Sequence, residues 1–307
     1  MTFALTILGS SSATPTQDRH PTAQLLNVQE QLFLIDCGEG TQMRLLNYKI
    51  KRSKLQHIFI SHLHGDHCYG LFGLLGTLSL HGRTEPMHIF APEGLQEMFE
   101  VVLKHSAEGA PPPFAIHFHT IDPTKNSLIF ENEILTVHTI PMEHRIACTG
   151  FLFREKPFIR NIYIEKIAEY AIDYQAIKAI KNGADFFYTL ENKWVKNEEL
   201  TYATLAPRSY AFCSDTRYKP DIIPIIQGVD LLYHEATFLK DSAERAAATC
   251  HCTTHQAAEI AKAAKVKRLI IGHFSSRYSN LETHQNEARE LFAESYLATE
   301  GTVFEVE

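Results

Sequence analysis

The sequence predicts an α/β fold, a four-layer αββα sandwich in which two mixed β-sheets face each other and helices cover their outer sides. Candidate strands precede candidate helices in each half of the chain, and this order repeats once. Hydrophobic residues make up 45% and charged residues 21% of the 307 positions, as in a globular protein with a large core. No short-period repeat is present, which argues against a solenoid. We therefore expect one domain spanning residues 1–307.

The elements alternate along the chain. Runs of β-branched and large apolar residues between turn residues predict strands, at 2–8, 23–28, 31–36, 56–60, 87–91, 210–213, 231–233, 268–272 and 302–306. Two further runs look like strands of the second sheet, at 115–121 and 128–139. Helical patterns fall between these strands, at 39–48, 66–80, 93–105, 254–264 and 282–296.

Composition excludes several classes of protein. The longest apolar run, 70–80, is shorter than the ~20 residues that span a bilayer. The N-terminus lacks the basic segment of a secretory signal, so we expect a cytoplasmic protein without membrane contact. A net charge of −7 argues against indiscriminate nucleic-acid binding, because Lys and Arg neutralise phosphates. The six Cys are scattered, without a C-x-x-C pair, and we expect them to be reduced and buried.

The strongest chemical signal is the segment His62-Leu63-His64-Gly65-Asp66-His67, directly after the strand at 56–60. In an extended chain, residues two apart face the same side, so His62 and His64 point together. Asp66 and His67 then begin a helix. Four metal-competent side chains therefore converge within six residues, and imidazole with carboxylate suits zinc, while mixed N/O sets also accept manganese or iron.

Three more candidate ligands stand where later strands end. His144 follows the strand-like run LTVHTI at 135–140, Asp215 follows the strand at 210–213, and His273 follows the strand at 268–272. Functional groups recur at the ends of sheet strands in α/β folds. Alone, each of the three is more often structural; beside the His62–His67 segment, each becomes a candidate ligand.

The H-x-H-x-D-H motif at 62–67 resembles the metallo-β-lactamase superfamily. Within it, further motifs resemble the ribonuclease Z family of tRNA 3′-processing endonucleases, at 36–42 (DCGEGTQ), 213–217 (CSDTR), 234–237 (HEAT), 253–258 (TTHQAA) and 273–278 (HFSSRY). The resemblance covers nearly the whole chain and implies the metallo-β-lactamase fold. It also implies two Zn²⁺ ions per chain, with manganese or iron as alternatives. One zinc would bind His62, His64 and His144, the other Asp66, His67 and His273, and Asp215 would bridge them.

The same resemblance suggests roles in catalysis. It makes Asp66 the proton acceptor that orients the nucleophile. His234 is the candidate proton donor to the leaving 3′-oxygen, with a buried structural histidine as the alternative. Arg217 and Arg277 flank ligand positions and could grip the RNA backbone, although a structural salt bridge is equally plausible for each. His251 and Ser275 are further candidates for the same cleft.

Residues 154–196 differ in character and form an expected insertion, an arm that binds the substrate. The segment carries eight Lys and Arg against six Asp and Glu, and eight aromatic residues including the only tryptophan. Ribonuclease Z relatives carry a tRNA-gripping arm here, with a Gly-Pro-rich stretch before a Lys-rich turn. The turn is present at 180–183, but the Gly-Pro stretch is not. We therefore expect Lys178, Lys181 and Lys193, with neighbouring aromatics, to bind precursor tRNA. A helical hairpin packed on the domain or on a second subunit is the alternative.

The resemblance implies a zinc-dependent endoribonuclease that removes the 3′ trailer from precursor tRNA. It would leave a 3′-hydroxyl on the tRNA and a 5′-phosphate on the trailer, and it would act as a homodimer. Two other functions remain open. A relative that hydrolyses a small ester, lactone or phosphodiester would not need a 43-residue, net-positive insertion. An RNA-binding or metal-sensing protein with a silent site should have lost some of the ligands.

Overall fold

The computed structural model describes residues 1–106 and 110–307. The described chain divides into two compact units. The larger unit comprises residues 1–154 and 208–307, and the smaller comprises residues 155–207. Each unit has a hydrophobic core of its own, so each is described by itself.

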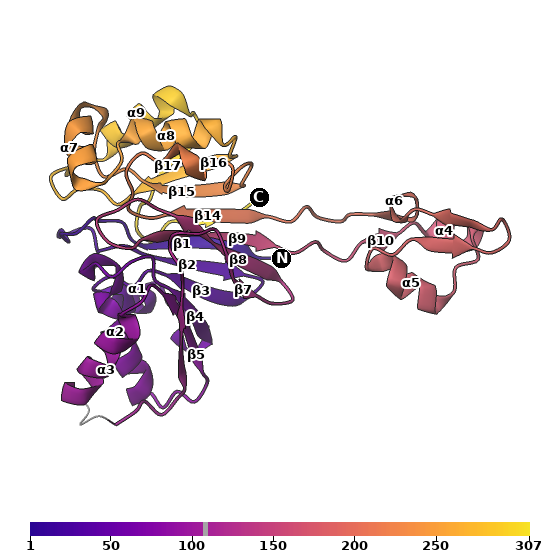
Figure 1. Ribbon diagram of the computed structural model, residues 1–307, viewed down its shortest axis with the longest axis horizontal. Coiled ribbons are helices and arrows are strands. Elements are labelled where there is room, and N and C mark those ends of the chain that lie inside the picture. The colour runs from indigo at the N-terminus through magenta and orange to yellow at the C-terminus, as the bar shows by residue number, and fades with distance from the viewer. Residues whose placement is uncertain (107–109) are drawn as a thin grey trace. The chain divides into compact units, whose positions relative to one another are not determined.

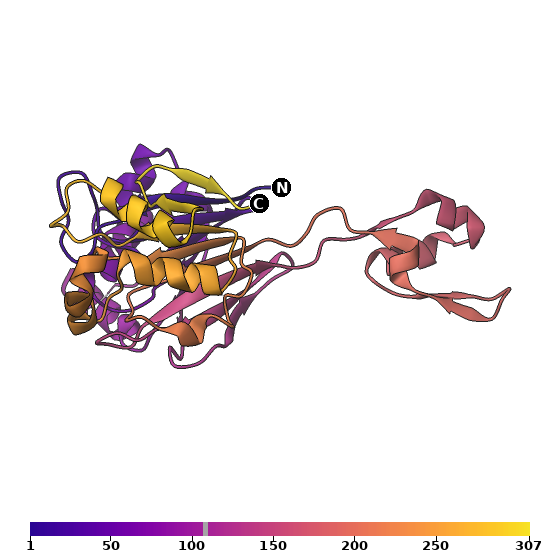
Figure 2. The same ribbon diagram turned by 90° about the horizontal axis from the view of Figure 1, so that it is seen from above.

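The larger unit contains two seven-stranded sheets. The first sheet runs in the order β18 (Val303–Glu305), β1 (Phe3–Gly9), β2 (Ala23–Val28), β3 (Gln31–Ile35), β4 (Leu55–Phe59), β5 (Met87–Ala91) and β6 (Ile116–Thr120). The pairings from β18 to β3 are antiparallel, and those from β3 to β6 are parallel. The two termini therefore lie close together, as Figure 2 shows.

The second sheet runs in the order β17 (Ser295–Leu297), β16 (Arg268–Gly272), β15 (Leu231–Glu235), β14 (Ser209–Cys213), β9 (Thr149–Glu155), β8 (Leu135–Pro141) and β7 (Leu128–Glu131). Strands β14 to β17 are parallel, whereas β9 is antiparallel to β14. This mixed arrangement matters for function, because parallel strands bring their carboxyl ends to one edge.

Helices cover the outer faces of both sheets, so the expected four-layer αββα architecture is confirmed (Figure 1). Helices α1 (Thr41–Asn47), α2 (Gly65–Leu80) and α3 (Leu95–Ser106) pack on the first sheet through one apolar cluster. A second cluster joins the facing sheets and extends to α8 (Thr254–Ala263) and α9 (Glu282–Leu291), near α7 (Ala243–Thr249). Short 3₁₀ turns complete the unit, at Arg52–Lys54, Pro220–Ile222 and Lys240–Ser242.

Three sequence-based expectations were wrong. Residues 115–121 form β6 of the first sheet rather than part of the second, since β6 pairs with β5. Residues 128–139 hold two antiparallel strands, β7 and β8, because the chain turns at Asn132. The last helix ends at Leu291, and residues after it form the edge strand β17. Sequence reasoning also missed β9 entirely.

The smaller unit packs four buried side chains, Ile172, Ile180, Val195 and Leu200, into a small core. Its elements are short, namely β10 (Asn161–Ile162), α4 (Ile164–Glu169), α5 (Tyr174–Lys181), β11 (Phe186–Tyr188), β12 (Lys193–Val195), α6 (Asn197–Leu200) and β13 (Thr201–Tyr202). Strand β10 pairs with β13, and β11 pairs with β12. The unit contains most of the segment 154–196 and continues eleven residues beyond it.

Within residues 1–106 and 110–307, no helix combines the length and the apolar character required to span a bilayer.

Candidate metal centre

The seven candidate ligands come from the carboxyl ends of strands in both sheets. His62 and His64 follow β4, and Asp66 and His67 lie in the first turn of α2. The remaining three follow strands of the second sheet, namely His144 after β8, Asp215 after β14 and His273 after β16. The topology therefore brings together side chains more than 200 residues apart in sequence.

A first cluster consists of His62, His64, His144 and Asp215, whose ligand atoms lie within 4.8 Å of one another. His64 Nδ1 lies 3.0 Å from His62 Nε2 and 3.2 Å from His144 Nε2. Asp215 Oδ2 lies 3.7 Å from both of those Nε2 atoms.

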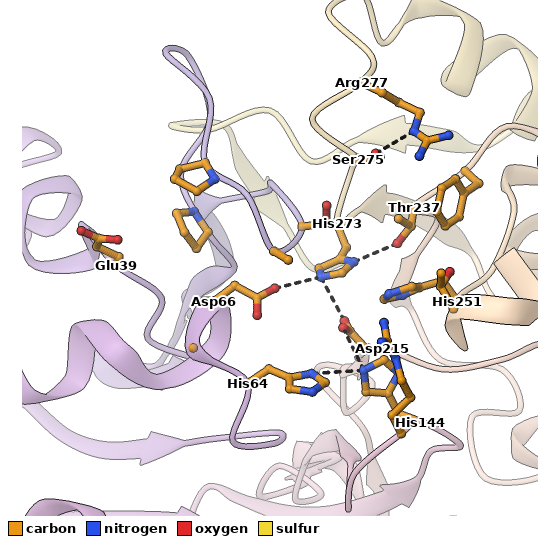
Figure 3. Close-up of a pocket in the computed structure, with 18 of the residues that line it drawn as sticks. Glu39, His64, Asp66, His144, Asp215, Thr237, His251, His273, Ser275 and Arg277 are labelled. Carbon is orange, nitrogen blue, oxygen red and sulfur yellow. Dashed lines mark hydrogen bonds and ion pairs between the residues drawn. The ribbon is translucent and has the colours of Figure 1, made fainter. Parts of the chain in front are cut away.

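A second cluster consists of Asp66, His67, His273 and again Asp215. Asp215 Oδ1 lies 3.4 Å from His67 Nε2 and 3.2 Å from His273 Nε2. Asp66 Oδ2 lies 3.4 Å from each of the same two nitrogens. Asp215 is thus shared between the two clusters, one oxygen facing each (Figure 3).

The outward ring nitrogens of four histidines are held by acceptors. His67 Nδ1 donates to Asp36 Oδ2 at 2.7 Å, and His144 Nδ1 donates to the Cys250 carbonyl at 3.0 Å. His273 Nδ1 lies 2.8 Å from Thr237 Oγ1, whose hydroxyl proton goes to Glu235.

The outward ring nitrogen of His62 is likewise held by a hydroxyl group. Its Nδ1 lies 3.0 Å from Ser61 Oγ, whose hydroxyl proton goes to Asp36 Oδ2. A neutral imidazole carries one N–H, so in the neutral form of each ring these four contacts leave Nε2 as a lone pair directed inward.

These hydrogen-bond assignments test whether the residues fit a cation. Four Nε2 lone pairs, His64 Nδ1 and the carboxylates of Asp66 and Asp215 face one another across 3.0–3.7 Å. Asp215 is almost fully buried, and no donor among the described residues forms a hydrogen bond to its Oδ1. Buried acceptors facing acceptors are unfavourable unless positive charge lies between them. The nitrogen–oxygen donor set therefore fits divalent metal ions.

Electrostatics keeps the two carboxylates ionised. Burial raises the pKa of Asp66, but His67 and His273 more than offset this, so the net pKa lies well below its ordinary value. Burial likewise raises the pKa of Asp215, and His273 and His67 lower it far more. Burial in turn lowers the pKa of His62 and of His144, which favours the neutral imidazole that a metal requires. Burial also lowers the pKa of His67, but Asp215, Asp66 and Asp36 raise it well above the ordinary value, so a bound cation would displace a proton from His67.

One candidate ligand and one residue that supports a ligand adopt a strained backbone conformation. His273 adopts φ = 60°, and Asp36, which anchors His67, adopts φ = 56°. Non-glycine residues in the left-handed region cost of order 1–3 kcal/mol and concentrate at functional sites. The fold thus holds both residues in conformations that their sequence alone would not favour.

The clusters open into a cavity of about 490 Å³. His64, Asp66, His144, Asp215 and His273 line it, so a substrate can reach the metal-competent atoms (Figure 3). The remaining lining residues include polar and apolar side chains, such as Ser12, Glu39, Tyr69, Phe238 and Ser275.

His251 also lines this cavity, and Glu235 of the HEAT motif lies behind it. His251 Nδ1 donates to Glu235 Oε1 at 3.0 Å. Burial lowers the pKa of His251, but the Glu235 carboxylate more than offsets this and raises the pKa to about 9. At neutral pH the ring is therefore protonated on both nitrogens and positively charged, and it faces the cavity.

His234, expected as the proton donor, is placed differently. Its side chain is fully buried and is not among the residues that line the cavity. Its Nδ1 donates to the Glu235 carbonyl at 2.7 Å, and burial lowers its pKa. A group that gives a proton to a leaving oxygen must reach it, so this placement argues against that role and leaves the structural alternative.

The structure also separates the arginines that line the cavity from one that does not. Arg277 lines the cavity, its Nε donating to Ser275 Oγ at 3.2 Å. Arg217 does not line it and lies 3.5 Å from Glu143 Oε1. Sequence reasoning missed Arg145 and Arg245, which line the cavity and form no ion pair with any described carboxylate. Only the position of Arg145, directly after His144, pointed toward it.

The three candidate lysines all lie in the smaller unit. Lys178 and Lys181 belong to α5. Lys193 begins β12, and its Nζ lies 2.6 Å from Glu191 Oε2. Nearby aromatic side chains are open to solvent, with Tyr174 87% and Trp194 65% exposed.

Comparison with known proteins places this geometry in a family. Residues 3–163, just over half of the chain, match the family model described as Anti-Pycsar protein Apyc1. Over nearly the full length, the chain is similar to proteins named ribonuclease Z. It is 46% identical to that of Parabacteroides distasonis over 299 residues, 97% of each chain, and 46% identical to that of Cytophaga hutchinsonii over 306 residues, 100% of this chain and 97% of the relative.

Solved structures agree with this. The crystal structure of human tRNase Z, short form, has a TM-score of 0.70 at 25% identity and covers 99% of each chain. The metallo-β-lactamase fold protein YhfI from Bacillus subtilis has a TM-score of 0.71 at 17% identity, covering 99% of this chain and 100% of its own, and supports the fold alone. The chain therefore belongs to the ribonuclease Z family, and its first half also to the sequence family described as Anti-Pycsar protein Apyc1.

Proposed function

We propose that the protein is a zinc-dependent endoribonuclease that removes the 3′ trailer from precursor tRNA. Cleavage leaves a 3′-hydroxyl on the tRNA and a 5′-phosphate on the trailer. The observation that carries this proposal is the convergence of seven ligands, from strand ends of both sheets, at a solvent-accessible cavity in a ribonuclease Z family member.

The donor set supports two zinc ions per chain, with manganese or iron as alternatives. His62, His64 and His144 would hold one ion, Asp66, His67 and His273 would hold the other, and Asp215 belongs to both groups of ligands. Two divalent ions bound there would supply positive charge to the phosphoryl oxygens and would make a water molecule easier to deprotonate.

Asp66 serves as the proton acceptor in this proposal. Its carboxylate lines the cavity and is held by contacts of 3.4 Å to His67 and His273. Because its pKa lies below the ordinary value, it is ionised at neutral pH and can accept a proton from the attacking water.

His251 replaces His234 as the proposed proton donor. It faces the cavity in its protonated form, and Glu235 fixes the orientation of its ring. Glu235 is itself fixed by the backbone N–H groups of Thr216, Thr237 and Cys252. As the bond from phosphorus to the tRNA 3′-oxygen breaks, His251 Nε2 gives its proton to that oxygen, which becomes the 3′-hydroxyl.

Arginines account for phosphate binding in the cavity. Arg145, Arg245 and Arg277 line it, whereas Arg217 pairs with Glu143 outside it. Guanidinium groups bind phosphate through bidentate hydrogen bonds. Three arginines that form no ion pair with a carboxylate in the described part of the chain thus give the site local positive charge, although the whole chain carries a net charge of −7.

The smaller unit is the proposed tRNA-binding arm. Lys178, Lys181 and Lys193 supply positive charge for the RNA backbone. The exposed rings of Phe187 and Trp194, with centroids 5.3 Å apart, offer a surface on which bases can stack. We place the protein in the cytoplasm, where precursor tRNA would meet it.

We also propose a homodimer. The support is a group of apolar side chains on α1 and α2 that are more than half exposed, namely Met43, Leu46, Tyr69 and Leu80. Introducing a charge with Leu46→Glu should convert a dimer to a monomer in analytical ultracentrifugation. A monomeric wild-type protein contradicts the proposal.

The decisive experiment compares three substrates. Purified protein is incubated with a precursor tRNA carrying a 3′ trailer, with the mature tRNA, and with bis(p-nitrophenyl) phosphate, each with and without a chelator. We expect one chelator-sensitive cut in the precursor, a 5′-phosphate on the trailer and no cut in mature tRNA. Hydrolysis of the nitrophenyl ester without any precursor cleavage indicates a small-phosphodiester hydrolase instead.

A further inference from the structure

A second group of histidines lies on the first sheet, away from the ligands described above. His57 lies on β4, His88 on β5, and His117 and His119 on β6. His57 is in register with His88, and His88 with His117. The mechanism uses none of these four side chains.

All four side chains lie on one face of the sheet. Side chains alternate between the faces of a strand, and Ile58, Ile89 and Phe118 contact the cluster under α1 to α3. The histidines therefore lie on the opposite face, beside Phe59 and Phe90. Their rings form a continuous row, with centroids 5.6 Å apart for His57 and His88 and 4.9 Å apart for His88 and His117.

The row includes one pair of ring nitrogens that are joined by a hydrogen bond. His88 Nδ1 lies 3.0 Å from His119 Nε2, and both side chains are accessible to solvent. The same separation, 3.0 Å, joins His62 Nε2 to His64 Nδ1 in the first metal-competent cluster. A tetrahedral zinc with bonds of 2.0–2.1 Å places two ligand nitrogens roughly 3.3 Å apart, so the spacing fits once both rings turn to direct their lone pairs at one ion.

The surroundings keep these rings in the form that binds metal. Burial lowers the pKa of His88, and His117 and His119 lower it further because neighbouring imidazolium charges repel. The pKa of His119 is lowered in the same way by burial and by His117. Uncharged imidazoles suit zinc, copper and nickel rather than magnesium or calcium, and a metal held by His88 and His119 would replace the hydrogen bond that joins the two rings.

We infer that His88 and His119 form a further binding site for a borderline divalent transition metal, such as Zn²⁺ or Cu²⁺. The ligands are His88 Nδ1 and His119 Nε2, and solvent completes the coordination. Among the described strands, β6 lies at the edge of the sheet and pairs with β5 alone. A metal held by one histidine from each strand therefore links the edge strand to its neighbour. This site is independent of the proposed nuclease activity.

The test uses the protein with its resident metals in place. The wild type, a His88→Gln/His119→Gln variant and a matched control, His81→Gln/His105→Gln, are dialysed against excess Zn²⁺ and analysed for metal. His81 and His105 are exposed histidines outside the row. We expect the wild type and the control to hold one more equivalent of zinc than the His88/His119 variant.

Copper provides a second readout that reports the ligands directly. Wild type loaded with one equivalent of Cu²⁺ should show nitrogen hyperfine coupling in its electron paramagnetic resonance spectrum, and the His88/His119 variant should lose this signal. Hydrolysis of bis(p-nitrophenyl) phosphate should be unchanged in both variants, which verifies their fold. Equal zinc content in all three proteins, or an equal loss in the control pair, overturns the inference.

Discussion

The metal centre and the smaller unit use polar side chains in opposite ways. At the centre, His67, His144 and His273 each make an outward hydrogen bond of 2.7–3.0 Å that fixes the ring. In the smaller unit, Trp194 is 65% exposed, and Lys193 contacts only the exposed Glu191 among the described carboxylates. The first region is largely buried and hydrogen-bonded, and the second is exposed to solvent.

The difference follows from the two tasks. Chemistry at phosphorus requires ligand positions fixed to within a fraction of an ångström, so the second contact of each histidine is part of the site. Binding a large RNA requires exposed charge and ring surface that can adapt to it. We expect substitutions in the two regions to separate catalysis from binding, and the following experiments test that separation.

The largest effect should come from Asp215→Ala. Asp215 faces both clusters, so its loss removes a ligand from each. We expect more than one equivalent of metal to be lost and both nuclease and phosphodiesterase activity to fall to background. Metal analysis beside the exposed Asp122→Ala control measures this. A wild type with one metal, or a variant that keeps its full metal content, contradicts the two-ion proposal.

Asp66→Asn should come next. The amide keeps the size of the side chain but cannot accept the proton, so turnover should fall by roughly 10²–10⁴-fold. Precursor tRNA binding, measured by filter retention, should be unchanged if the smaller unit carries the affinity. Near-normal cleavage by the variant excludes Asp66 as the acceptor.

His251→Gln tests the assignment of the proton donor. A poor alcohol leaving group needs protonation, so precursor cleavage should fall by about 10²-fold. p-Nitrophenolate needs little protonation, so hydrolysis of its ester should fall much less. His234→Gln is the matched comparison, and it should affect the two substrates equally. A selective loss on precursor tRNA in the His234 variant instead restores His234 as donor.

Replacing residues 157–205 with a short Gly/Ser linker should leave metal content and ester hydrolysis largely intact, because the centre lies in the other unit. Precursor binding should weaken by about 100-fold, equivalent to two contacts of ~1.4 kcal/mol. Its salt dependence should flatten, since fewer phosphates lose their counterions. Unchanged affinity makes the smaller unit a packing or dimer element.

The smallest effect should come from Trp194→Ala. Loss of one stacked base costs ~1–3 kcal/mol, so affinity for precursor tRNA should fall by about tenfold with an unchanged salt slope. Lys178→Gln/Lys181→Gln should instead reduce the salt slope. Both variants should hydrolyse the nitrophenyl ester at the wild-type rate, and a slower rate contradicts the separation of binding from chemistry.

Local sequence patterns predicted much of this protein. Alternating strands and helices predicted two facing sheets, because hydrophobic periodicity is a short-range property of the chain. The spacing at 62–67 predicted a group of metal-competent side chains, since residues two apart in an extended segment point the same way. The predictions were wrong where a strand's pairing partner determines the sheet to which it belongs. Strand β6, for example, lies in the first sheet because it pairs with β5.

The tertiary structure alone decided what surrounds the ligands. Glu235 and His251 are sixteen residues apart, yet their side chains meet at 3.0 Å and put His251, rather than His234, at the cavity. Asp36 reaches His67 from 31 residues away. Sequence spacing selects side chains that can bind a metal, but burial and long-range hydrogen bonds determine which lone pairs point inward and which protons can reach the substrate.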